Sequence, residues 1–333
     1  MPQRLRGVVR EFGAAVDVVG TERYAPVDPG PGEVAVRMSL ASINPSDMVT
    51  ISGAYASRTT LPFVPGFEGV GVVEAIGPDV HGLSPGQRVL PLGSAGAWQH
   101  TKVTEARWCH PVRAELTDRQ AATAYINPLT ALLMVRQYVQ GTAARTVVVN
   151  AAASAIGLML IRMLNRLGIR PVAVVRHPRS LERLTGTDLA RTVCTTDRAA
   201  GEAVRECSMG RGADVVLDAV GGAEGAELAR ALAAGGTLVH YGLLSGRPLP
   251  TRPAVERPDV RIALFRLRDW VHATQATAPH RLTDALAEVF ALVLDGTAAS
   301  QIARVHPLSE VRQALRQDAE AGRRGKVLLR PAD

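Results

Sequence analysis

Residues that could bind an anion gather in a turn of small side chains at positions 150–157. The sequence there is Asn-Ala-Ala-Ala-Ser-Ala-Ile-Gly, and only Ile156 carries a large side chain. An apolar run at 147–149 precedes the turn, and a mostly apolar segment with one polar stripe follows it, as in a strand–turn–helix unit. Backbone N–H groups at such a helix start can approach a pyrophosphate. The residues expected to contact a dinucleotide are Ala153, Ser154, Ala155 and Ile156. The alternative interpretation is an ordinary crossover without a ligand.

Two arginines follow the next expected strand, at 171–175. Sites for NAD place an Asp or Glu at this point, on the ribose 2′-hydroxyl. The chain instead reads Arg176-His177-Pro178-Arg179. A guanidinium group can bind a phosphate through paired hydrogen bonds. Arg176 and Arg179 therefore indicate a site for a 2′-phosphate, and we expect NADPH as the cofactor. A solvated basic loop is the alternative.

Alternating strands and helices must position this turn. One helix is expected from about residue 119, through Pro128, to 139. After the turn, helices are expected at 201–209 and 224–233, and strands at 192–195, 215–219, 237–241 and 260–264. This order predicts a doubly wound parallel sheet of five or six strands.

The first 117 residues have a different pattern, with short strands between Gly and Pro turns. Strands are expected at 33–40, 69–76 and 87–90, which suggests a small β-barrel-like domain. A helix is expected at 282–294, followed by a strand, a helix and a strand at 303–306, 309–319 and 326–330. The expected fold class is therefore α/β, with a Rossmann-type doubly wound sheet and a separate β-barrel domain.

Composition restricts the possible classes of function. The chain has 333 residues, 47% of them hydrophobic, which is enough for two domains with full cores. Three cysteines argue against a disulfide framework, and no signal-peptide core or membrane-spanning run is seen, so we expect a cytoplasmic protein. The net charge of +7 comes from scattered arginines, since Lys102 and Lys326 are the only lysines. With 4% aromatic residues, this pattern argues against nucleic acid and favours an anionic cofactor or an acidic carrier partner.

Four segments together resemble the medium-chain dehydrogenase/reductase superfamily, over nearly the whole length. Within it, the chain is similar to the zinc-independent 2-enoyl thioester reductases of the mitochondrial type. The segments are SINPSDMVTISGAYAS at 42–57, YINPLT at 125–130, the turn at 149–157 and VHYGLLS at 239–245. The resemblance implies a GroES-like β-barrel catalytic domain at 1–118, completed by 300–333, and a Rossmann NADPH-binding domain at 119–299.

The same comparison of motifs predicts that no metal is bound. Metal-dependent members use Cys and His ligands in the first domain, and here Asn44 and Phe67 stand at those places. No C-x-x-C motif occurs, and the histidines are dispersed, so a tetrahedral site of nitrogen and sulfur ligands cannot be built.

The resemblance implies that Tyr55 and Asn44 belong to the catalytic site. Reduction of an α,β-unsaturated thioester needs a donor for the carbonyl oxygen and a source for the α-proton. A phenol such as that of Tyr55 can serve as either, although a half-buried packing residue is the alternative. Asn44 and Asp47 could hold the loop that carries Tyr55, or Pro45, Ser46 and Asp47 could form an Asx-type turn.

Further contacts are implied by the same family. Those to the cofactor are Asn127, Thr130, Tyr241, Leu243 and Lys326, and those to the substrate are Phe265, Arg266 and Trp270. Arg266 departs from the family's Phe-Trp-Leu-x-x-Trp pattern and could be a surface residue. Ala155 stands where Gly is usual, which would cost about 1 kcal/mol if that position needs a positive φ.

These observations lead to a prediction of NADPH-dependent reduction of an activated C=C bond, in a 2-enoyl thioester carried by CoA or an acyl carrier protein. A quinone or enone reductase of the same fold is one alternative, and a nucleotide-binding protein without catalysis is another. The apolar strand at 260–264 would leave an unprotected sheet edge, so we also expect a homodimer joined there.

Overall fold

The computed structural model describes residues 4–320 and 322–332, which form two compact units. One unit comprises Met1–Ile126 with Val271–Asp333, and the other comprises Asn127–Trp270. The sequence-based division at 118/119 and 299/300 differs from these boundaries, because the helix at Pro279–Leu294 groups with the first unit. None of the described helices combines the length and apolar character needed to cross a membrane.

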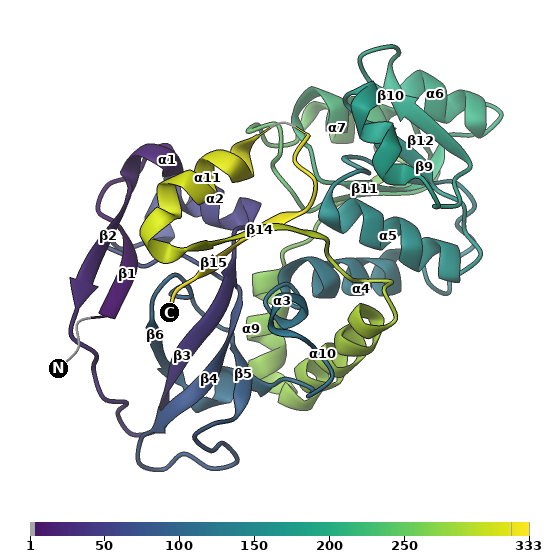
Figure 1. The fold of residues 1–333 in the computed structure, drawn as a ribbon. Coiled ribbons are helices and arrows are strands. Elements are labelled where there is room, and N and C mark those ends of the chain that lie inside the picture. Colours follow the sequence, from purple (N-terminus) through teal and green to yellow (C-terminus); the bar gives the residue numbers. More distant parts are fainter. Residues whose placement is uncertain (1–3, 321, 333) are drawn as a thin grey trace. The chain divides into compact units, whose positions relative to one another are not determined.

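A seven-stranded sheet forms the frame of the first unit (Figure 1). Its path runs β14-β15-β3-β4-β5-β7, and β6 pairs with β3. A separate pair, β1 and β2, is antiparallel. The strands are β1 (Arg4–Val9), β2 (Val19–Tyr24), β3 (Glu33–Ser42), β4 (Gly69–Ile76), β5 (Arg88–Pro91), β6 (Thr101–Glu105), β7 (Cys109–Pro111), β14 (Ile302–Pro307) and β15 (Lys326–Arg330).

Helices connect these strands, and all of them except α10 are short. They are α1 (Ala15–Val18), α2 (Pro45–Ile51), η1 (Ala56–Arg58), η2 (Ala106–Trp108), α3 (Asp118–Ala121), α10 (Pro279–Leu294), η4 (Leu308–Glu310) and α11 (Val311–Ala319). The helix α9 (Leu267–Thr277) spans the boundary at residue 270.

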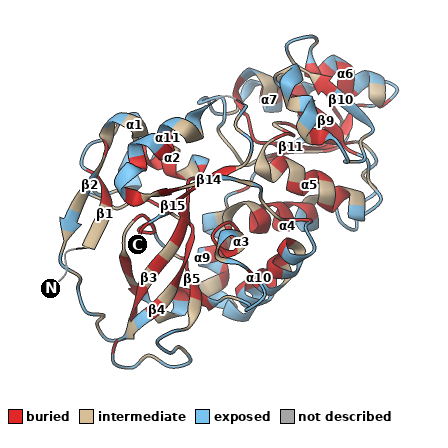
Figure 2. Ribbon diagram, viewed as in Figure 1, coloured by how far each residue is buried: buried red, intermediate tan, exposed pale blue. Residues whose placement is uncertain are grey.

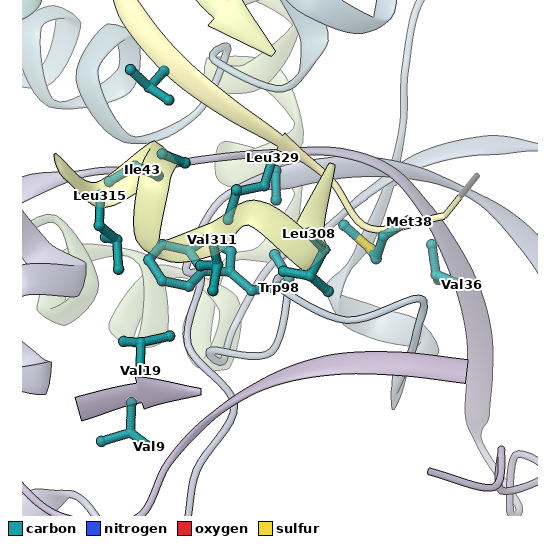
Figure 3. Close-up of a cluster of buried hydrophobic side chains, with 14 of the residues drawn as sticks. Val9, Val19, Val36, Met38, Ile43, Trp98, Leu308, Val311, Leu315 and Leu329 are labelled. Carbon is teal, nitrogen blue, oxygen red and sulfur yellow. The ribbon is translucent and has the colours of Figure 1, made fainter. Parts of the chain in front are cut away.

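The C-terminal strands complete the N-terminal sheet, as predicted. The strand β15 pairs antiparallel with β3, with Leu329 opposite Ala41. The apolar side of the sheet packs against α11, where Val311 and Leu315 join Trp98 in one core cluster (Figure 3). Burial of such side chains contributes about 1.5–3 kcal/mol each. The first unit therefore depends on residues from both ends of the chain.

The second unit contains six parallel strands in the order β10-β9-β8-β11-β12-β13. This order confirms the predicted doubly wound sheet. Its strands are β8 (Val147–Val149), β9 (Val172–Val175), β10 (Arg191–Cys194), β11 (Ala213–Asp218), β12 (Leu232–His240) and β13 (Arg261–Leu264). Its helices are α4 (Ile126–Tyr138), α5 (Ala155–Arg166), η3 (Pro178–Leu184), α6 (Ala200–Cys207), α7 (Gly222–Arg230) and α8 (Arg252–Glu256).

Continuous apolar runs explain the central strands. All residues of β8 and β9 are buried, as Figure 2 shows for β9. The helix α5 packs on β8, and its polar Arg162, Asn165 and Arg166 are half-buried or exposed, so the predicted polar stripe lies away from the core. Gly168, with φ of 74°, follows the helix end and accommodates a conformation that side chains rarely adopt.

The single helix expected from residue 119 to 139 was wrong, because the structure has two helices there. The first, α3, ends at Ala121, and α4 begins at Ile126. Pro128 lies in the first turn of α4, where its missing N–H costs nothing. The N–H groups of Tyr125 and Ile126 donate instead to the Glu68 carboxylate, at 2.9 Å each. A partner that is distant in sequence therefore fixes the break.

Candidate active site and cofactor site

The predicted nucleotide turn joins β8 to α5. Ser154 caps the helix, because its hydroxyl accepts a hydrogen bond from the N–H of Gly157 at 3.1 Å. A Cβ at Gly157 would lie 2.5 Å from the carbonyl oxygen of Ala152, so only glycine fits there. Ala153 is buried, whereas Ser154 and Ile156 are half-buried. The turn thus places the start of α5 at the carboxyl end of a central parallel strand, where an anion can be bound.

The conformational cost considered for Ala155 falls on a different residue. Ala155 is the first residue of α5, and φ is positive at Ala151 instead, at 44°. The condition for strain at Ala155, a positive φ, is therefore not met. An alanine in this region costs about 1 kcal/mol relative to glycine, and the cost is located at Ala151.

The two predicted phosphate-binding arginines lie beyond β9. Arg176 directly follows the strand, and Arg179 is in η3. Both side chains are exposed, and neither guanidinium has a hydrogen-bond partner among residues 4–320 and 322–332. They are therefore free to bind a phosphate group.

The sequence reasoning missed a buried polar cluster at the carboxyl ends of the strands β8, β11 and β12. The Asp218 carboxylate accepts a hydrogen bond from Asn150 Nδ2 at 2.6 Å, and its other oxygen lies 2.7 Å from His240 Nδ1. Burial raises the pKa of Asp218, but hydrogen bonds from His240, Gly221 and Asn150 outweigh burial and lower it. All three side chains stand at or just beyond the carboxyl ends of strands, which is the signal that could have revealed the cluster.

The other predicted cofactor contacts in this unit lie on α4 and after β12. Asn127 is half-buried in the first turn of α4, and Thr130 is buried one turn later. Tyr241 and Leu243 follow β12 and are half-buried. The hydroxyl of Tyr241 is buried without a hydrogen-bond partner among the described residues, and burial raises its pKa. A buried hydroxyl without a partner is a candidate contact for a ligand oxygen.

In the first unit, Asn44 is the N-cap of α2. It forms a capping box with Asp47, whose carboxylate accepts the Asn44 N–H at 2.8 Å. The second oxygen of Asp47 accepts the N–H of Phe67 at 3.1 Å, and burial raises the pKa of Asp47 to about 7. Two roles were considered for this segment: holding the loop that carries Tyr55, and forming an Asx-type turn. The same hydrogen bonds of Asp47 serve both.

Glu68 lies at the centre of a buried network, which we call the Glu68 network and which consists of Ser42, Asn44, Glu68 and Lys326. One carboxylate oxygen of Glu68 accepts the Ser42 hydroxyl at 2.5 Å and Asn44 Nδ2 at 2.9 Å. The other oxygen accepts the N–H groups of Tyr125 and Ile126. A single side chain therefore ties the loop after β3 to the segment that leads into α4.

Lys326 supplies the cation of this network. Its side chain is buried, its Nζ donates to Asn44 Oδ1, and the same nitrogen lies 4.0 Å from the Glu68 carboxylate. Burial lowers the pKa of Lys326. The structure thus places Lys326 in a buried network, and its contact with the cofactor stays a prediction. The amide of Asn44 also bonds within the network, since it donates to Ser42 and Glu68 and accepts from Lys326. These contacts hold the start of α2, and the part of Asn44 in catalysis stays a prediction.

Tyr55 follows α2 on an exposed bend before η1. Gly53 has φ of 86°, and a Cβ there would lie 2.9 Å from Phe12, so the glycine of the Gly-x-Tyr segment is required. The Tyr55 side chain is 43% exposed, whereas Asn44 at the other end of α2 is fully buried. The helix is therefore anchored at its start and presents a phenol beyond its end.

The predicted substrate residues have different environments. Phe265 is buried, and its N–H donates to the carbonyl of His240. Arg266 is 45% exposed and lies 3.9 Å from Asp269, while Trp270 is half-buried on α9. The exposure of Arg266 is consistent with the surface position considered for it, and its contact with the substrate stays a prediction.

Comparisons with known proteins agree with this architecture. Residues 30–156 match the alcohol dehydrogenase GroES-like domain, and residues 190–329 match the zinc-binding dehydrogenase family. No group of three His, Cys, Asp or Glu side chains that could hold a metal occurs in the described ranges.

Two relatives are named mitochondrial enoyl-[acyl-carrier-protein] reductases. The protein of Arabidopsis thaliana is 31% identical, over 79% of this chain and 72% of its own. That of Xenopus tropicalis is 30% identical, over 95% and 92%. A solved structure, described as a putative NADPH:quinone reductase from Bacillus thuringiensis, is 33% identical with a TM-score of 0.92 and covers 99% of both chains.

The two domain matches, the relatives and the parallel sheet with its completed β domain lead to one family. The chain is an oxidoreductase of the medium-chain dehydrogenase/reductase superfamily, and it belongs to the group that includes the mitochondrial enoyl-[acyl-carrier-protein] reductases, as its motifs predicted.

Proposed function

We propose that the protein uses NADPH to reduce the C=C bond of a 2-enoyl thioester. The observation that carries the proposal is the phenol of Tyr55, presented on a loop that the Glu68 network anchors. The relatives named enoyl-[acyl-carrier-protein] reductases support the substrate class. The free Arg176 and Arg179 support NADPH, because they stand where a carboxylate would select NAD.

The chain's own residues would stabilise charge and move a proton. When bound, NADPH supplies a hydride to the β-carbon of the substrate. Negative charge then develops on the thioester oxygen, and the Tyr55 hydroxyl donates a hydrogen bond to it or delivers the α-proton. Asn44 and Glu68 act through the loop: their buried hydrogen bonds hold the start of α2.

Reduction of a quinone or enone is the second candidate function. The solved structure described as a putative NADPH:quinone reductase, which is 33% identical, favours it. Both activities need hydride transfer to an activated acceptor, so the fold alone does not choose between them.

A panel of acceptors distinguishes these possibilities. NADPH oxidation would be followed with crotonyl-CoA, crotonyl-acyl carrier protein, a benzoquinone and an enone at equal concentrations. We expect the highest kcat/KM with one of the two thioesters, and their ratio identifies the carrier. A higher kcat/KM with the quinone would make quinone reduction the favoured function. If no acceptor supports NADPH oxidation, nucleotide binding without catalysis would be favoured.

Replacing Arg176 by Asp is expected to raise the KM for NADPH at least tenfold more than that for NADH. The substitution removes a phosphate contact and places a negative charge beside the 2′-phosphate. Steady-state kinetics with both cofactors measures the effect. Arg170→Asp is a matched control, because Arg170 is exposed and pairs with Asp188. Equal changes in both KM values would contradict a role for Arg176 in reading the phosphate.

Activity is expected to survive exhaustive chelation, with no stoichiometric zinc in the purified protein. Asn44 stands where related enzymes have a Cys ligand, and its amide is committed to Ser42, Glu68 and Lys326. Elemental analysis of the purified chain provides the measurement. One zinc per chain, lost together with activity on chelation, would refute the prediction.

The protein is expected to form a homodimer through β13. This strand lies at the edge of the six-stranded sheet, and Leu264 is 56% exposed. An unpaired apolar edge favours pairing with a second copy. Light scattering at micromolar concentration should give twice the monomer mass, and Ile262→Pro should give the monomer because it removes an N–H from the edge strand. A monomeric mass for the parent protein would be contrary evidence.

A further inference from the structure

We propose that a cavity in the first unit binds a phosphate-bearing small molecule through three arginines. The cavity has a volume of about 430 Å³ and lies beside β3, α3 and β15. Arg37, Arg119 and Arg330 line it, one from each of these elements. The elements α3 and β3 are in contact. The residues lining this cavity are different from those assigned above to catalysis, cofactor and substrate.

The cavity carries an excess of positive charge. Arg37, Arg119 and Arg330 have no carboxylate partner among the described residues, in contrast to Arg4, Arg6 or Arg257, which pair with acids. Arg37 is half-buried and the other two are exposed. Three unpaired guanidiniums near one another repel each other, so an anion between them would be stabilised.

Asp118 is the acidic residue that also lines the cavity, and it is already compensated. Its carboxylate accepts a hydrogen bond from Arg88 at 2.7 Å, and Arg88 also donates to the carbonyl of Leu116. This ion pair leaves the charges of the three lining arginines unmatched. The pair also fixes the start of α3 and with it the position of Arg119.

The charge and the size of the cavity point to a phosphate ester. A guanidinium can donate two parallel hydrogen bonds to phosphate oxygens, and three of them exceed the single charge of a carboxylate. The Ser39 hydroxyl, two residues after Arg37 on β3, adds a possible donor. A volume of about 430 Å³ is within the range of small-molecule sites, which leaves room for an organic group beside the phosphate.

Calorimetric titration at low salt tests the proposal, with pyrophosphate and 4′-phosphopantetheine as probes. Arg37→Gln/Arg330→Gln should weaken binding at least tenfold. Arg281→Gln/Arg304→Gln is the matched control, because both residues are exposed in the same unit and lie outside the cavity lining. This control should stay within twofold of the parent. Tighter binding of 4′-phosphopantetheine would support an organic phosphate, and tighter binding of pyrophosphate would support a free one.

A second variant pair separates this site from the predicted cofactor site. Arg176→Gln/Arg179→Gln should leave binding at the cavity intact. Three outcomes would each overturn the proposal. Arg176→Gln/Arg179→Gln could abolish all phosphate binding, or Arg37→Gln/Arg330→Gln could leave the affinity unchanged. The third outcome is an equal loss of affinity in Arg37→Gln/Arg330→Gln and in the control Arg281→Gln/Arg304→Gln. If Arg37→Gln/Arg330→Gln fails to fold, Arg119→Gln replaces it, with an expected weakening of at least threefold and the same contrary outcomes.

Discussion

Replacing Tyr55 by Phe is expected to lower kcat about 100-fold, or roughly 3 kcal/mol of barrier. The substitution keeps the ring and removes only the hydroxyl that would face the developing negative charge. A fixed donor gains more from an enolate oxygen than from the ground-state carbonyl, so the loss should appear in kcat more than in KM. The measurement is steady-state kinetics on the best acceptor of the panel, beside the dissociation constant of NADPH.

The environment of Tyr55 makes this test sharp. Its side chain is 43% exposed, so the loss of the hydroxyl should leave the fold and NADPH binding unchanged. Tyr138→Phe is a matched control, since Tyr138 is half-buried on α4 with Arg261 above its ring. A kcat for Tyr55→Phe within threefold of the parent, under about 1 kcal/mol of barrier, would make Tyr55 a packing residue.

The parallel sheet could be predicted because its signals are local. The run Val147–Val149 is buried on both faces, and the small side chains of the following turn mark the start of a helix. Both features occupy only a few consecutive residues. The edge position of β13 also follows from strand order along the chain. Such features need no knowledge of distant contacts.

The Glu68 network could not be predicted, because its partners are far apart in sequence. Lys326 and Asn44 are 282 positions apart, and Glu68 lies 57 positions from Tyr125. No periodicity links these residues. The same distant contact explains the error in the helix expected from 119 to 139, since Glu68 takes the N–H groups at the start of α4. Tertiary hydrogen bonds here override a local pattern that favoured one continuous helix.

Both lysines of the chain are buried, although lysine is usually an exposed residue. Lys102 donates to the carbonyl oxygens of Pro91 and Ser94, at 2.9 and 2.7 Å, and burial lowers its pKa to about 8. Lys326 donates to Asn44 and lies beside the Glu68 carboxylate. Only the second lysine therefore compensates a buried charge, which makes the two residues a matched pair for experiment.

Replacing Lys326 by Met is expected to lower the free energy of unfolding by about 3–5 kcal/mol, because it leaves the Glu68 carboxylate buried without its cation. Removing the charge as well, in Lys326→Met/Glu68→Gln, should cost less than the sum of the single substitutions. The expected coupling is about 1–3 kcal/mol, measured by urea denaturation of all four proteins in the cycle. Lys102→Met leaves two carbonyls without a donor but no uncompensated charge, so it should show no coupling to Glu68→Gln. Additive losses for Lys326→Met and Glu68→Gln would show that Lys326 does not stabilise Glu68, and that the hydrogen bonds to Ser42, Asn44, Tyr125 and Ile126 suffice to hold this carboxylate.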